Sequence, residues 1–176
     1  MQLIKKSKSF QKNTKYFEMH TYTFNLHEAV INESISQDWD FAIQEWEIVG
    51  TYEDHGSTCT CGKKNISEIN IIKNKFTGAT LKVGSQCVKQ FMNVDMFVIH
   101  ANVRKIAKDI TKSVNRPTLW FFYQQGVITG QEFLDYVEIF RRRTLFLHQS
   151  NFKIAINQKI LDFQQQTKKE ATNAIS

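Results

Sequence analysis

The sequence predicts an α+β fold in which an α+β module, residues 1–93, is followed by an all-helical module, residues 94–176. The first part combines short runs of β-branched and aromatic residues with glycine-containing turns, which is typical of strands and hairpins. The second part spaces its apolar residues three or four positions apart, the period of an amphipathic helix. No repeat of solenoid length is visible.

The composition is that of a folded protein, because 41% hydrophobic and 12% aromatic residues suffice for a buried core. No segment approaches eighteen consecutive apolar residues, so we expect no membrane partner. The basic N-terminus is not followed by an apolar stretch, so it does not resemble a secretory signal. Three cysteines, an odd number, indicate a reducing compartment. We therefore expect the protein in the cytoplasm.

Several elements are predicted before the cysteines. Aromatic and β-branched residues over 16–24 predict a strand, and residues 25–28 have the form of a capping box that opens a short helix. Ser36 is expected to cap the next helix, which turns its tryptophans inward and Glu45 toward water.

The middle of the chain predicts a small sheet. Residues 47–52 read as a strand that enters a polar turn over residues 53–58. Two further β-like runs, 66–73 and 79–83, are joined by a turn with Gly78 at its corner. This arrangement predicts a β-hairpin.

The second module predicts four helices, each with a recognisable start or period. The first covers residues 95–113, and the second covers residues 118–125 with Pro117 in its first turn. The third runs from the capping box 129–132 to the arginines 141–143. The fourth runs from the cap Ser150 to about residue 163. The polar tail beyond about residue 164 is expected to fray.

Three cysteines frame the predicted hairpin. Cys59 and Cys61 lie in a tight turn before it, and Cys87 lies in the first turn of a short helix after it. Zinc prefers four such ligands in a tetrahedron. Gly62 relieves the turn, and Gly84 lets the chain reverse into the helix. The order of knuckle, hairpin and helix predicts a treble-clef-like module with a structural zinc.

The fourth zinc ligand is less clear from the sequence. The Cys-x-Cys spacing is tighter than the usual Cys-x-x-Cys, and Gln90 stands three residues after Cys87, where a treble clef places its last ligand. His55 is the predicted ligand, with Asp54 or a water molecule as alternatives. Another interpretation is that the cysteines are buried free thiols. Redox or catalytic cysteine chemistry is not expected, because no helix-borne Cys-x-x-Cys is present.

Four short stretches around these cysteines form a pattern: Ala42-x-x-Glu45-Trp46-Glu47, Cys59-x-Cys61-Gly62, Ile71-x-x-Asn74-x-x-Thr77-Gly78, and Val83-Gly84-x-x-Cys87-Val88-Lys89-x-Phe91. Together they resemble small zinc-finger-like proteins of bacteriophages and mobile elements. The run Gly126-Val127-Ile128-Thr129-x-x-Glu132-Phe133 is similar to their helical tails, so the likeness covers residues 39–163. The resemblance implies a zinc module and a phage or plasmid setting within a bacterial host cell, and no particular activity.

The charges fall in blocks along the chain. Residues 27–55 carry eight acids and no Lys or Arg, whereas residues 62–92 carry six lysines against one acid. With Phe76 at the hairpin tip, these lysines form the predicted nucleic-acid-binding set: Lys63, Lys64, Lys73, Lys75, Lys82 and Lys89. Cations and an exposed ring suit phosphate contact and base stacking without sequence preference. Alternatively, the acidic and basic blocks neutralise each other and Phe76 folds into the core.

A second hypothesis is a protein-binding module that inhibits or recruits a host protein, for example a host enzyme or a defence system. The acidic block would then meet a basic partner, and the aromatic run 119–123 would supply an apolar contact. An enzyme is not expected, because the histidines are scattered and no phosphate loop or dinucleotide fingerprint occurs. We therefore predict no catalytic residue and no small-molecule substrate.

Overall fold

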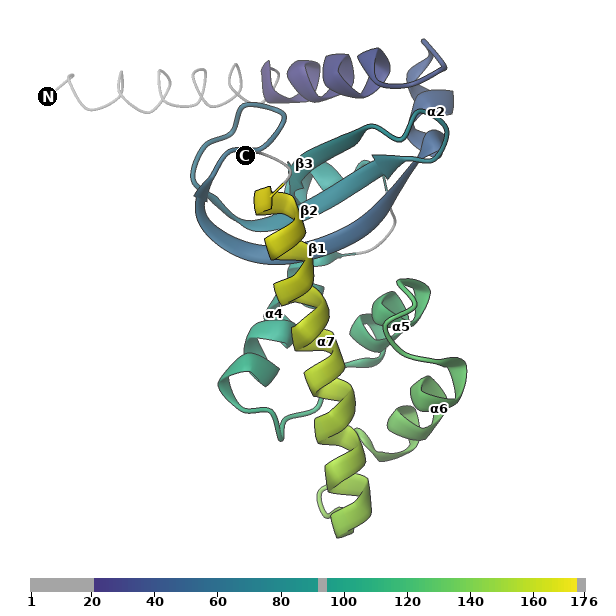
Figure 1. The fold of residues 1–176 in the computed structure, drawn as a ribbon, viewed down its shortest axis with the longest axis vertical. Helices are drawn as coiled ribbons and strands as arrows, with labels where there is room; N and C mark the ends of the chain where they lie inside the picture. The colour runs from purple at the N-terminus through teal and green to yellow at the C-terminus, as the bar shows by residue number, and fades with distance from the viewer. Residues whose placement is uncertain (1–20, 92–94, 174–176) are drawn as a thin grey trace, which may run out of the picture.

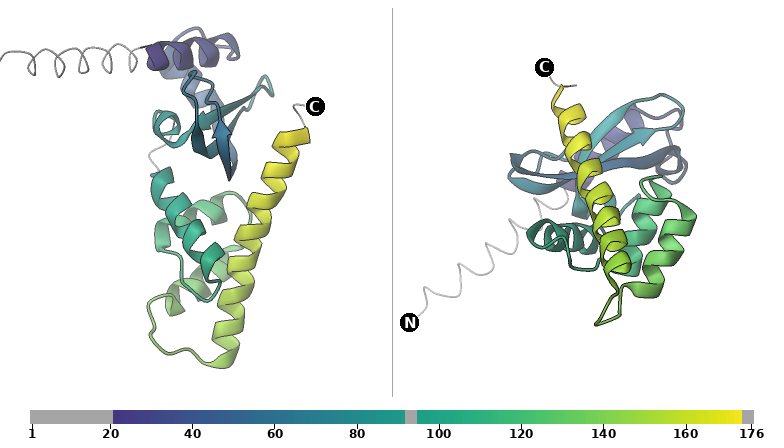
Figure 2. Two further views of the ribbon diagram at one scale, coloured as in Figure 1. Left: turned by 90° about the vertical axis from the view of Figure 1, so that its left-hand side faces the viewer. Right: turned by 60° about the horizontal axis from the view of Figure 1, so that its bottom comes forward.

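A computed structural model of the chain describes residues 21–91 and 95–173. Over these ranges a three-stranded antiparallel sheet, in the order β1-β2-β3, lies beside a group of helices, and one long helix runs along both (Figures 1 and 2). The predicted α+β class is confirmed. Within the described ranges, no helix combines the length and the apolar character needed to cross a membrane.

The helices and strands follow one another in a simple order. Residues 21–32 are helical. After them come α2 (Trp39–Ala42), the 3-10 helix η1 (Ile43–Glu45), β1 (Trp46–Ser57), β2 (Ile66–Asn74), β3 (Thr80–Gly84), α3 (Ser85–Val88), α4 (Met96–Lys108), α5 (Arg116–Gln124), α6 (Gly130–Ile139) and α7 (Leu147–Asn173).

The first described segment corrects the sequence prediction. A strand was predicted over residues 16–24, but residues 21–32 form a helix, and residues 16–20 lie outside the described part of the chain. Leu26 and Val30, one helical turn apart, are both fully buried. This apolar stripe of a 3.6-residue period outweighs the β propensity of the neighbouring aromatic and threonine residues.

Two predicted helix starts are also wrong. Residues 25–28 do not open a helix, because they lie inside the helix that already includes residue 21. Ser36 is not the N-cap of α2. That position belongs to Asp38, whose Oδ1 accepts hydrogen bonds from the N–H groups of Asp40 (3.0 Å) and Phe41 (3.3 Å). A carboxylate at the N-cap satisfies amides that have no partner within the helix.

Glu45 is buried, whereas the helical pattern predicted that it faces water. Its carboxylate accepts hydrogen bonds from the backbone N–H groups of Ile35 (2.9 Å) and Ser36 (2.8 Å) and from Nδ2 of Asn74 (2.8 Å). The hydrogen bond from Asn74, helped by the two backbone donors, lowers the pKa of Glu45. This charged contact ties the segment before α2 to the end of β2.

Strand β1 is longer than predicted. The polar residues 53–57, expected in a turn, continue the strand and so place His55 on it. The register against β2 shifts between Ile48 and Gly50, where two β1 residues stand opposite one β2 residue. Such a bulge bends a strand locally and marks a special position in a sheet.

The hairpin of β2 and β3 confirms its prediction. In the turn, Oδ1 of Asn74 accepts hydrogen bonds from the N–H groups of Phe76 (2.8 Å) and Thr77 (3.0 Å). Gly78 has φ +77°, a conformation that favours glycine. The turn is therefore fixed by local chemistry that the sequence makes visible.

The helical part confirms the capping box of α6, in which Thr129 and Glu132 exchange side-chain and backbone hydrogen bonds. The last helix differs from its prediction at both ends. It begins at Leu147, before Ser150, and it continues to Asn173 instead of fraying near residue 164. Its second half is ordered against the sheet, since Thr167 is buried there.

Helix α7 contacts both the sheet and the other helices. Toward the sheet, Nζ of Lys168 lies 3.0 Å from Oδ1 of Asp54 on β1. Toward the helices, Nδ2 of Asn157 donates to the carbonyl of Ile110 (2.6 Å), and its Oδ1 accepts from the hydroxyl of Tyr136 (2.8 Å). Figure 2 shows α7, in yellow, running alongside the helical part and on beside the sheet.

Candidate metal centre

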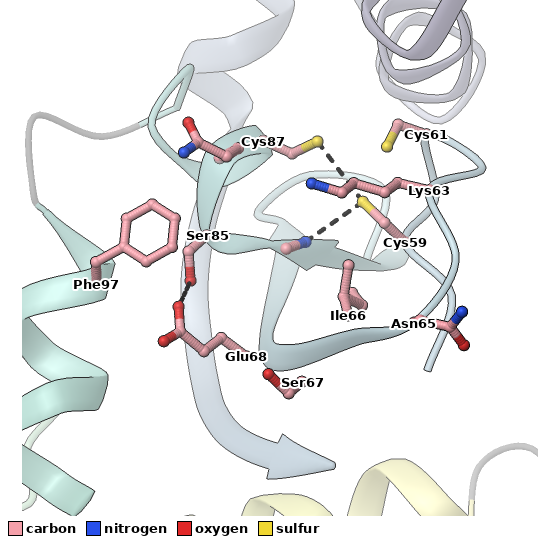
Figure 3. A pocket seen from close by; sticks show the side chains of 12 residues that line it. Cys59, Cys61, Lys63, Asn65, Ile66, Ser67, Glu68, Ser85, Cys87 and Phe97 are labelled. Carbon is pink, nitrogen blue, oxygen red and sulfur yellow. Dashed lines mark hydrogen bonds between the residues drawn. The ribbon is translucent and has the colours of Figure 1, made fainter. Parts of the chain in front are cut away.

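The three cysteines come together at one end of the hairpin. Cys59 and Cys61 lie in the loop between β1 and β2, and Cys87 lies in α3. Their Sγ atoms are all within 4.8 Å of one another, and those of Cys59 and Cys87 are 3.6 Å apart. Cys59 and Cys61 are buried, Cys87 is half-buried, and none of the three is in a disulfide (Figure 3). The predicted clustering of these residues is confirmed.

The cysteine loop is held by backbone hydrogen bonds. The N–H of Gly62 donates to the carbonyl of Cys59 (2.8 Å), and the N–H of Cys59 donates to the carbonyl of Lys63 (2.9 Å). Between the two cysteines, both the N–H and the hydroxyl of Thr60 donate to the carbonyl of Lys82 on β3, each over 2.8 Å. Gly62 has φ +92°, which explains the glycine after the knuckle.

Two further hydrogen bonds hold the cysteines, one to a sulfur and one to a backbone carbonyl. The N–H of Gly84 donates to Sγ of Cys59 over 3.3 Å. Nδ2 of Asn25, on the first described helix, donates to the carbonyl of Cys61 over 3.1 Å. The backbone of Gly84 is extended, with φ −78° and ψ 165°, so this glycine supplies an N–H to the site rather than an unusual turn.

The three cysteines differ in the direction in which their pKa is shifted. The hydrogen bond with Cys87, together with the N–H of Gly84, lowers the pKa of Cys59 to about 5. Burial raises the pKa of Cys61, and the hydrogen bond with Cys59 raises that of Cys87. Cys59 is thus the cysteine of the three whose surroundings favour the thiolate, the form of cysteine that binds a metal.

The cluster passes a simple test of fit to a metal. A tetrahedral site with metal–sulfur bonds of about 2.3 Å separates its sulfurs by about 3.8 Å. The 3.6 Å between Cys59 and Cys87, and the 4.8 Å limit on the whole group, are close to that spacing. Three thiolates also suit the metals that prefer soft ligands. Cys59, Cys61 and Cys87 therefore form a possible metal site.

The structure does not bring the predicted fourth ligand to this group. His55 is exposed on β1, and Asp54 accepts from the hydroxyl of Ser57 (3.0 Å) and pairs with Lys168. Over residues 21–91 and 95–173, the three sulfurs are the only group of three or more Cys, His, Asp or Glu ligand atoms that lie within 4.8 Å of one another.

A cavity of about 240 Å³ lies against the cluster and is lined by all three cysteines. Its walls include Lys63, Glu68, Ser85 and Phe97 (Figure 3). Sequence reasoning missed Glu68 and Ser85, whose side chains are joined by a 2.7 Å hydrogen bond. One signal was available, because Glu68 is the single acid within the lysine-rich block 62–92.

The predicted nucleic-acid-binding residues separate into two groups. Close in sequence to the three cysteines lie the exposed Lys63, Lys64 and Lys89. Nζ of Lys89 is 3.6 Å from Oδ1 of Asp95 and 5.0 Å from the ring centre of Phe97. Asp95 therefore partly neutralises the charge of Lys89.

The second group lies at the opposite end of the hairpin. Lys73, Lys75 and Phe76 are exposed at the β2–β3 turn, with 68% of Phe76 accessible to solvent. Lys82 is half-buried on β3 between the two groups. The nine residues of β2 separate the ends by about 30 Å at about 3.3 Å per residue. The six lysines therefore do not form a single patch.

No protein-family model matches the chain, and no curated protein or solved structure matches it either.

Proposed function

We propose that this protein binds one zinc ion through Cys59, Cys61 and Cys87 and holds single-stranded nucleic acid on the β2–β3 turn. The observation that carries the zinc proposal is the cluster of three sulfur atoms within 4.8 Å. An accessory protein of phage or mobile-element type is the setting that fits both properties.

The zinc has a structural role in this proposal. Its ligands come from the loop before the hairpin and from the helix after it, so one ion joins segments that are 28 residues apart. Knuckle, hairpin and helix follow in the order of a treble-clef-like zinc module. Metal binding to such a set contributes directly to folding, because no preformed site exists in the unfolded chain.

Elemental analysis of the purified chain tests the zinc proposal. We expect one zinc per chain in the wild type and a large loss of zinc in Cys61→Ser, which removes one sulfur. His55→Ala is the matched control and keeps its zinc, because His55 lies on β1 outside the sulfur group. A folded wild type without metal would contradict the proposal.

The nucleic-acid proposal rests on the turn itself. Phe76 is 68% exposed, although its backbone N–H is fixed by the side chain of Asn74. Lys73 and Lys75 are exposed on either side of Asn74. A ring on a rigid turn stacks on a base at low entropic cost, and adjacent cations contact phosphates.

Fluorescence anisotropy with a labelled oligothymidine tests this site. Phe76→Ala is expected to weaken binding about 5- to 100-fold, the loss of one stacked base. Phe146→Ala, which removes an equally exposed ring (71%) elsewhere, leaves binding unchanged. The double variant Lys73→Ala with Lys75→Ala is expected to reduce the salt dependence of the binding affinity, because two phosphate contacts are lost. The same double change at the exposed Lys105 and Lys108 on α4 is the control. No binding at low salt would exclude the proposal.

A protein partner is the second candidate, and one observation favours it. Ile35, whose N–H donates to Glu45, and Phe41 on α2 are exposed by 68% and 65%. Large exposed apolar side chains are typical of protein interfaces where they form a patch. A stoichiometric host protein that is retained after nuclease treatment, and lost with Phe41→Ala, would favour this candidate.

A further inference from the structure

The cavity beside the cysteine cluster is bounded by all three candidate metal ligands. Its volume is about 240 Å³, and Cys59, Cys61 and Cys87 all line it. Closed zinc sites have four protein ligands, whereas three protein ligands leave one position for a molecule from solution. Within the described ranges of the chain, the three sulfurs gather without a further His, Asp or Glu.

The acid in the cavity wall is engaged by other groups. Oε1 of Glu68 accepts a hydrogen bond from Arg104 over 2.9 Å, and Oε2 accepts from the hydroxyl of Ser85 over 2.7 Å. Moving this carboxylate to a metal would break both contacts and leave the Arg104 guanidinium with only Glu53 as partner. Glu68 therefore shapes the cavity and does not complete the metal site.

The remaining walls favour a small anionic ligand with an apolar part. Lys63 lines the cavity, and Figure 3 shows its side chain reaching into the space between Cys87 and Cys59. Three thiolates around a divalent ion carry one net negative charge, so this ammonium offsets the charge of a further anion. Ile66 and Phe97 supply apolar contacts.

We infer that the metal held by Cys59, Cys61 and Cys87 takes a small thiolate from solution as its fourth ligand, through this cavity. The inference rests on the proposed metal site and replaces a closed coordination shell by one exchangeable position. Thiolate matches the soft character of the three protein ligands. On binding, the thiol releases its proton to the buffer.

Cobalt substitution provides the test, because tetrahedral cobalt reports its ligands by absorption whereas zinc is silent. The chain is loaded with one cobalt ion, and 2-mercaptoethanol is titrated in. We expect a saturable rise in sulfur-to-cobalt charge-transfer absorption that corresponds to one added thiolate per cobalt. Imidazole, a neutral ligand, is expected to bind more weakly, because it gains nothing from Lys63.

Two variants form a matched pair. Lys63→Ala is expected to weaken thiol binding about three- to tenfold, because a nearby positive charge is lost. Lys64→Ala removes the adjacent exposed lysine, which does not line the cavity, and is expected to leave thiol binding unchanged. Both variants keep the cobalt content of the wild type.

The outcomes separate this inference from the proposed function. A chain that binds no cobalt would overturn both. A chain that binds cobalt, but whose spectrum does not respond to thiol, has its fourth position filled from within, and only the exchangeable position is overturned. Extraction of cobalt by the thiol, seen as loss of protein-bound metal after gel filtration, would overturn it equally.

Discussion

His100 is a fully buried histidine on α4 whose two ring nitrogens have different surroundings. Nε2 lies 3.0 Å from the hydroxyl oxygen of Thr51, and that hydroxyl donates to the carbonyl of Ile69. Thr51 therefore accepts from Nε2–H, which fixes the neutral tautomer. Nδ1 has no hydrogen-bond partner and lies 4.0 Å from Oε1 of Glu53, which accepts from Arg104 instead.

Acid is expected to destabilise the fold through His100. Burial lowers its pKa, although Glu68 on β2 and Glu53 on β1 oppose this effect; Arg104 on α4 adds to it. The unfolded chain, with a histidine pKa of about 6.5, then binds the proton more readily than the folded chain. The contribution of His100 to stability is complete above that value and decreases as the pH falls below it.

Urea unfolding at pH 7.5 and 5.0 measures this effect. His100→Gln is expected to lose less stability between the two pH values than the wild type, because Gln has no proton to gain. His148→Gln, at an exposed position, is expected to behave like the wild type. An equal pH dependence in all three proteins would show that His100 does not titrate on unfolding.

Among the elements, β1 and α7 pack closely at Gly50. Gly50 follows the β1 bulge, and a Cβ atom at this position would lie 2.3 Å from Cγ2 of Thr167. This is far below any normal carbon–carbon contact, so glycine permits the approach of the helix. The absence of a side chain at Gly50 allows Thr167 to be buried and α7 to remain ordered beyond residue 164.

Gly50→Ala is expected to reduce the free energy of unfolding by about 1–3 kcal/mol, because the added methyl group overpacks the contact. Thr167→Ser removes Cγ2 and is expected to restore part of that loss, as a double-mutant cycle would show. Gly130→Ala on α6 is the control. Its Cβ would make an ordinary 3.7 Å contact, so its effect is neutral or stabilising. Equal losses at both positions would contradict this account.

In the whole molecule, α7 joins the sheet to the helical part along its length, in addition to the contacts that α4 makes with the sheet. Its 27 residues extend about 40 Å at 1.5 Å per residue. Asn157 contacts the helical part through Tyr136 and Ile110, and Lys168 contacts β1 through Asp54.

Ending the chain after Phe163 is expected to weaken the sheet more than the helices. The truncation removes Thr167 and Lys168 from β1 but leaves Asn157 in place. Amide hydrogen exchange should therefore become faster along β1, including Thr51 and Tyr52, while α5 and α6 change little. Unchanged protection of β1 would show that the second half of α7 does not stabilise the sheet.

The parts of the fold that depend on local signals could be predicted from the sequence. The hairpin turn follows from Asn74 and Gly78, and the start of α6 follows from Thr129 and Glu132. The clustering of the cysteines was also predictable, because a hairpin returns the chain to the loop before it. Their spacing around that hairpin was the signal.

Other features depend on contacts between distant residues and could not be predicted. The burial of Glu45 needs Asn74, which is 29 residues away. The end of α7 can pack on the sheet only because Gly50 has no side chain. The helix over residues 21–32 is favoured by the burial of Leu26 in the core, which outweighs the β propensity of its neighbours. The cavity beside the sulfurs has no sequence signature, because it is the space that several elements leave between them.

The β2–β3 turn and the cysteine cluster lie at opposite ends of one hairpin, because Lys73 pairs with Thr80 beside the turn and Ile69 pairs with Gly84 beside the cluster. The turn is supported by Asn74 and Glu45, and the cluster by Thr60 and Gly84, so the two ends share no supporting residue. Residues 75–78 can therefore diverge in evolution, or be replaced by a grafted recognition loop, while the cysteine end keeps its shape.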